Sequence, residues 1–217
     1  MGSSRALLAA LVSGLCTIVR VGAAQNPDST YGRRALDRFL ERTHADARLP
    51  DSLRSLTADR LDSLSVAYFG MLDDSSMALY LRTTVAMLHQ LPEPQCAVAG
   101  GLTGAHTLTL AGMLSAVDSA TVDSLLLVHE RALLAATRAA SPRVGTPDEL
   151  RDVMGRLITG LPSEQQQRFM FIARNPPPNQ ADACWASQTL FGELAKLPPG
   201  ELGPVMRRMS APPAPRR

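Results

Sequence analysis

Apolar side chains recur every three to five residues along most of this chain, with charged residues between them. This period is typical of amphipathic helices, and no run of alternating β-branched residues indicates a strand. The pattern predicts helices over residues 31–47, 53–72, 76–91, 121–140, 147–160, 164–174, 180–197 and 201–209. The expected fold class is therefore all-α, an irregular bundle of about seven or eight helices with short connectors.

Capping residues and prolines mark the ends of these predicted helices. We expect caps at Asp73-Asp74-Ser75 and Thr146-Pro147-Asp148-Glu149, a capping box at Ser163 with Gln166, and a helix end at Pro92 and Pro94. Short polar side chains satisfy the free N–H groups of a first helical turn. Proline suits the first helical position and interrupts a helix elsewhere.

Residues 94–117 contain no charged side chain and are rich in glycine and alanine. The lack of charge favours a central helix that packs through its small residues. The glycines lower helix propensity, so a loop over part of 97–117 is the alternative. Length alone admits a membrane-associated segment, but the threonines, the glycines and His106 argue against a span.

The first 24 residues have the layout of a secretory signal peptide. Arg5 precedes an apolar stretch over 6–19, and small residues lead up to Ala24, after which we expect cleavage. An uncleaved anchor is the rival, but the stretch is short for a span of about 20 residues. The predicted organisation is a signal peptide at 1–24, a single helical domain at 25–209 and a disordered Pro/Arg tail at 210–217. The mature protein is expected to be periplasmic or extracellular.

Charge gives no indication of a nucleic-acid partner. The chain has 22 basic and 20 acidic residues, and removal of 1–24 takes two arginines and no acid, which leaves a net charge of zero. A neutral chain has no general attraction to nucleic acid or to an anionic membrane. Lys196 is the only lysine, which is more typical of a biased genomic base composition than of phosphate recognition.

Cleavage would leave two cysteines, Cys96 and Cys184. In an oxidising compartment, an even cysteine count favours one disulfide, which here would close a long loop. The alternative is two separate buried thiols, because free cysteine packs like a small apolar residue.

Three residues are candidates for a functional site: His106, His129 and Glu130. His106 lies in the uncharged segment, where burial would displace its pKa. His129-Glu130 begins like the zinc-protease motif H-E-x-x-H, but Leu133 occupies the place of the second histidine. No catalytic residue, metal site or cofactor is assigned from sequence, and each histidine is otherwise an ordinary core or surface residue.

Two pentapeptides resemble the L-T-x-x-Q signature of exported helical stress chaperones of the Spy type. Leu161-Pro162-Ser163-Glu164-Gln165 has the Leu and the Gln but lacks the Thr, whereas Leu56-Thr57-Ala58-Asp59-Arg60 has the Thr but lacks the Gln. Each resemblance covers five residues. It implies a periplasmic chaperone-like function as one alternative and does not assign the family.

The leading hypothesis is an exported, non-enzymatic helical protein of the cell envelope that binds a protein or a small apolar ligand. It predicts an apolar patch or groove, for example around 97–114. The alternative is an enzyme with dispersed catalytic residues around His106. Arg34, Arg38 and Arg42, with the acids beside them, suit either an interface or a solvated helix face.

Overall fold

The computed structural model is all-helical over the residues that it describes, 29–58, 60–61, 68–100, 109–138, 141–175 and 179–210. This confirms the predicted fold class. The helices in these ranges are α2 (Ser29–Ala45), α3 (Asp51–Arg54), α5 (Asp74–Gln90), α6 (Glu93–Ala99), α7 (Leu110–Leu114), α8 (Ser119–Ala135), α9 (Pro147–Gly160), α10 (Ser163–Arg174), α11 (Gln180–Leu194) and α12 (Pro199–Ser210). The predicted signal peptide at 1–24 and all but the first residue of the tail at 210–217 lie outside the described residues.

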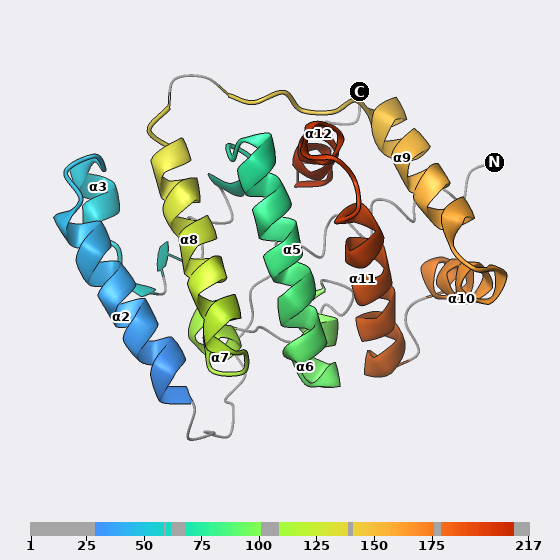
Figure 1. Ribbon diagram of the computed structural model, residues 1–217, viewed down its shortest axis with the longest axis horizontal. Coiled ribbons are helices and arrows are strands. Elements are labelled where there is room, and N and C mark those ends of the chain that lie inside the picture. The colour runs from blue at the N-terminus through green and yellow to red at the C-terminus, as the bar shows by residue number, and fades with distance from the viewer. Residues whose placement is uncertain are drawn as a thin grey trace.

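Four long helices, α2, α8, α5 and α11, lie side by side in that order (Figure 1). The small helix α6 packs on α11, and α12 packs on α5 and α9. Buried side chains from every one of these helices belong to one hydrophobic cluster. The helices α2 and α8 run in the same direction and form one edge of the bundle, which positions the groove described below.

Most predicted helix starts are confirmed, because the capping side chains act as expected. Asp73 accepts a hydrogen bond from the Ser76 amide at the start of α5, and Thr146 and Glu149 form a capping box at the start of α9. The predicted capping box at Ser163 is wrong: Pro162 is the N-cap of α10 and provides no side-chain hydrogen bond.

The prediction of one helix over 53–72 is also wrong. Helix α3 ends at Arg54, and Ser55, Leu56 and Thr57 are not helical. The Leu56 side chain is almost fully buried, and its carbonyl accepts a hydrogen bond from His44 Nε2 at 2.9 Å. Tertiary contacts with α2 therefore interrupt the helix that the apolar spacing of residues 53–72 predicts. Residues 59 and 62–67 of the predicted helix lie outside the described residues.

The central helix expected within 94–117 is replaced by shorter elements. Pro94 lies in the first turn of α6 and does not end the preceding helix, because Leu91 already leaves α5 in an extended conformation. Thr109 is extended (ψ 153°), and its side chain accepts from the Gly112 amide to begin α7. Residues 101–108, including His106, lie outside the described residues.

Helix α12 confirms the short helix predicted over 201–209, and it contributes the most buried charge in the described chain. The Arg207 side chain is 2% exposed. Its Nε donates to the Arg143 carbonyl at 2.7 Å, its Nη1 donates to the Leu72 carbonyl at 2.7 Å, and its Nη2 pairs with Asp74. One guanidinium therefore ties α12 to the start of α5 and to the connector before α9.

Among the described residues, no helix combines the length and the apolar character that crossing a membrane requires.

Candidate functional site

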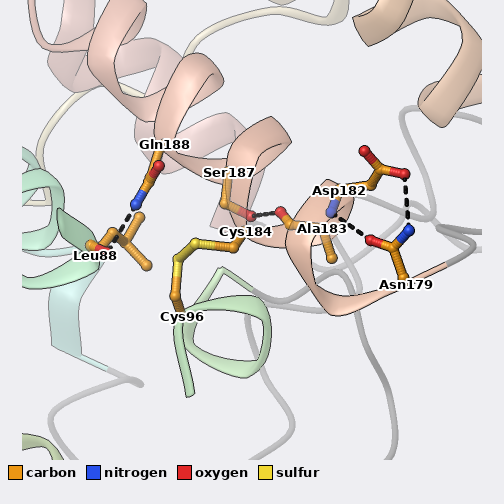
Figure 2. Close-up of a disulfide and its surroundings, with 8 residues drawn as sticks. All are labelled: Leu88, Cys96, Asn179, Asp182, Ala183, Cys184, Ser187 and Gln188. Carbon is orange, nitrogen blue, oxygen red and sulfur yellow. Dashed lines mark hydrogen bonds between the residues drawn. A yellow bond between two sulfur atoms is a disulfide. The ribbon is translucent and has the colours of Figure 1, made fainter. Parts of the chain in front are cut away.

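Cys96 and Cys184 form the predicted disulfide, with their Cα atoms 5.1 Å apart. Cys96 lies on α6 and Cys184 on α11, and both side chains are buried (Figure 2). The two helices approach closely beside the bond, since a Cβ added to Gly100 would lie 2.0 Å from Ser187 Oγ. The bond closes a loop across 88 residues and thereby joins the middle of the chain to its C-terminal part.

His129 is a core residue of α8. Its side chain is buried, Nδ1 donates to the Leu125 carbonyl at 2.8 Å, and the ring meets Phe69 edge-on at 5.5 Å. Burial lowers the pKa of His129 below the ordinary value of 6.5, because a charged imidazolium loses its hydration there. The ring is therefore neutral near pH 7.

Glu130 points away from His129, although the two are neighbours in sequence. The Glu130 side chain is 41% exposed, and its nearest cation is Arg48, whose Nη2 lies 3.8 Å from Glu130 Oε1. Adjacent residues on a helix differ by about 100° in direction, so His129 faces the core while Glu130 faces the α2–α8 surface. The structure does not bring these two candidates together in one cleft. No group of His, Cys, Asp and Glu suited to a metal ion occurs within the described ranges.

Glu130 belongs to a groove between α2 and α8, which we call the α2–α8 groove. Its α8 wall is one helical stripe, Asp123, Leu127, Glu130 and Leu134, at spacings of four, three and four residues. Its α2 wall is a matching stripe that contains Ala35, Arg38, Arg42 and Ala45. Both walls therefore follow from the period of 3.6 residues per turn.

Two adjoining hollows make up the groove. The larger has a volume of about 310 Å³ and lies over Phe39, Leu49 and Leu133. The smaller, of about 210 Å³, lies over Ala35 and Leu126. Arg42 and Glu130 line both hollows, so they face each other across the junction. Leu127 rises from the α8 wall with 40% of its surface exposed.

The charges of the groove are divided between its walls. The α2 wall is basic: Arg38 approaches only the Tyr31 ring, at 6.0 Å, and Arg42 has no hydrogen bond or ion pair to any described residue. The α8 wall is acidic through Asp123 and Glu130. Tyr31 Oη donates to Asp123 at 2.9 Å, which raises the pKa of Tyr31. A partner would thus meet unpaired guanidinium groups on one side and carboxylates on the other.

A third hollow, of about 430 Å³, lies outside the groove, between α9 and α12. Its charged lining is largely paired within the protein, because Arg143 binds Glu149 at 2.8 Å and Arg156 binds Glu201.

In the α2–α8 groove, Arg48 pairs with Asp46 at 2.6 Å and approaches Glu130 at one end, but Arg38 and Arg42 form no ion pair with any described residue. We take the α2–α8 groove as the candidate functional site because these two guanidinium groups are available to a partner.

Comparison with known proteins does not assign this chain to a family. No protein-family model, no curated protein and no solved structure matches the chain. The candidate site therefore stands on its residues and their arrangement alone.

Sequence reasoning found part of this site. The sequence indicates Arg38 and Arg42 as candidates for an interface and Glu130 as a candidate for a functional site, but it does not indicate Leu127. Arg34 does not join them: its side chain returns to Thr30, with Nε donating to the Thr30 carbonyl at 3.1 Å. A sequence pattern that indicates Leu127 is the helical stripe Asp123, Leu127, Glu130 and Leu134. This stripe mixes charged and apolar residues, so it is not expected to be a buried face, and Leu127 is expected to be exposed.

The buried histidine predicts a pH-dependent stability. Because the folded-state pKa of His129 is lowered, the unfolded chain binds a proton below about pH 6.5 that the folded chain does not bind. We expect the free energy of unfolding to fall between pH 7.5 and pH 5 by at most about 2 kcal/mol, the limit set by one unfolded-state histidine with a pKa near 6.5. Urea unfolding followed by circular dichroism measures this change.

The control is His129→Leu, which should remove most of this slope while the exposed His44 and His89 remain. The carboxyls with lowered pKa values, such as Asp46 at about 2 beside Arg48, do not interfere, since unfolded carboxyls protonate mainly below about pH 5. Equal slopes in the wild type and in His129→Leu would contradict the prediction.

Proposed function

We propose that this protein is exported to the cell envelope and acts there, without catalysis, as an interaction protein that binds a partner through the α2–α8 groove. The single observation that carries the proposal is the groove itself, in which a half-exposed leucine lies between a basic wall and an acidic wall. Exposed apolar side chains rimmed by charges are typical of protein-binding surfaces.

The disulfide supports the export part of the proposal. Structural disulfides persist in oxidising compartments and are rare in the cytosol. Cys96 and Cys184 are bonded and buried between α6 and α11, as a structural cross-link would be. The apolar stretch before Ala24 supplies the matching export signal.

The groove suits a protein partner better than a small apolar ligand. Small-molecule pockets enclose most of their ligand within about 300–1,000 Å³. The two hollows here, of about 310 and 210 Å³, lie in series along two parallel helices. A helical surface of a partner fits such a trough, with apolar residues toward Leu127 and charged residues toward the walls.

Native mass spectrometry of the protein purified from its own envelope tests this function. We expect a chain that begins at Gln25, a mass two hydrogens below that of the reduced form, and a bound protein subunit. Leu127→Arg should remove the bound subunit, because it replaces the apolar side chain in the middle of the groove with a positive charge on the acidic α8 wall. Val144→Arg is the matched control, since Val144 is 48% exposed and lies outside the groove.

An uncleaved chain with free thiols would contradict the export part of the proposal. A bound subunit that Leu127→Arg retains would place the binding surface elsewhere.

A further inference from the structure

The two walls of the α2–α8 groove carry opposite charges at the same level along the helices. Arg42 and Glu130 line both hollows, one from each wall. Toward the N-termini, Arg38 lies one turn before Arg42 and Asp123 two turns before Glu130, and both line the smaller hollow. The hydrogen bond between Tyr31 and Asp123 joins the N-terminal parts of α2 and α8, which run in the same direction (Figure 1).

A surface of this kind is complementary to itself. Rotation by 180° about an axis parallel to the groove keeps the position of every residue along the helix direction. It also places the α2 wall of one copy opposite the α8 wall of the other. The basic α2 wall of one copy then lies over the acidic α8 wall of the other, and each contact occurs twice. An axis across the groove would place arginine over arginine and is disfavoured.

We infer that the occupant of the α2–α8 groove is a second copy of this chain, held in a two-fold dimer whose axis runs along the groove. The inference rests on the proposed function and names the partner of that same surface. Arg42 of each copy faces Glu130 of the other, and Arg38 faces Asp123. Leu127 loses its exposure against the α2 stripe of the second copy, which adds an apolar contact at the centre.

The contact surface comprises one face of two helices of 17 residues each. Stable dimers bury about 800 Å² per copy, and a contact confined to one face of two helices, each about 25 Å long, lies at the small end of such interfaces. The dimer is therefore expected to be weak, with a dissociation constant in the range of about 1–100 μM, and to weaken with added salt because the charge pairs at its rim are screened.

Analytical ultracentrifugation of the exported, disulfide-bonded protein at low ionic strength tests the inference. The wild type should convert from monomer to dimer with rising concentration. R42E and E130R should each raise the dissociation constant by about tenfold or more, since each reverses two symmetric contacts. R33E is the matched control: Arg33 is exposed on α2, has no described partner and does not line the groove.

The decisive sample is an equimolar mixture of R42E and E130R. In the two-fold dimer, a heterodimer of these variants pairs the new acid at position 42 with the new base at position 130, and it keeps the original Arg42–Glu130 pair at the other contact. Dimerisation should therefore return to nearly the wild-type constant on mixing. Far-ultraviolet circular dichroism of each variant verifies that the helices are intact.

Two results would overturn the inference. One is a wild type that stays monomeric up to about 1 mM, a concentration well above the expected dissociation constant. The other is a dimer that is insensitive to R42E and E130R or is not restored by mixing them. Neither result removes the proposed function, which depends on whether Leu127→Arg releases the subunit bound in the native spectrum.

Discussion

Replacing both disulfide cysteines with alanine (C96A/C184A) is expected to lower the free energy of unfolding by about 4–5 kcal/mol. The bond spans 88 residues, so it removes many extended conformations from the unfolded chain. Both side chains are buried, and the alanines also leave a small cavity between α6 and α11. Urea unfolding followed by circular dichroism gives the change directly.

Reduction provides the control for this prediction. Dithiothreitol should bring the wild type close to the stability of C96A/C184A and should leave the double variant unchanged. A wild type whose urea midpoint does not respond to reduction would contradict the prediction, because the cross-link would then add nothing to contacts such as the Gln188 Nε2 bond to the Leu88 carbonyl (Figure 2).

Replacing Arg207 with methionine is expected to cost about 3 kcal/mol. The methionine fills the space, but it leaves the buried Leu72 carbonyl and the half-buried Arg143 carbonyl without this donor, and it removes the cation that pairs with Asp74. A buried polar group that loses its partner costs about 1–3 kcal/mol. The Asp74 side chain is 40% exposed, so water hydrates it when the ion pair is lost. Loss of the ion pair therefore contributes less to the change in unfolding free energy than loss of a fully buried pair would.

Arg208→Met is the matched control for this change. Arg208 is the next residue of α12, is half-buried and makes no hydrogen bond or ion pair with the described part of the chain. We expect its replacement to change the free energy of unfolding by less than about 0.5 kcal/mol. Equal losses for the two substitutions would show that the three segments joined by Arg207 are held by their apolar packing alone.

The helices that the sequence predicted well are those whose ends are marked by a capping side chain or a proline. Asp73, Asp118 and Thr146 cap α5, α8 and α9 through their own side chains, and such signals depend only on neighbouring residues. The disulfide was also predictable, because an even cysteine count combined with the predicted export signal favours one bond.

The predictions that failed concern places where contacts from distant residues decide the structure. Leu56 breaks the expected helix because its side chain enters the core and its carbonyl meets His44, twelve residues away. His129 and Glu130 are neighbours in sequence, yet only the packing of α8 determines that one faces Phe69 and the other faces α2. No local pattern distinguishes those two environments.

The sequence by itself determined the helical class and most helix ends, because periodicity and capping act locally. It favoured a bond between Cys96 and Cys184 and left two separate buried thiols as the alternative, and the structure decided between the two. Only the tertiary structure decided that Arg207 is a buried tie between three segments, since its partners Leu72, Asp74 and Arg143 are 64 to 135 residues away. It also decided that the stripes of α2 and α8 lie beside each other in register. Which surfaces meet depends on the packing of the whole chain, and the α2–α8 groove exists only as a product of that packing.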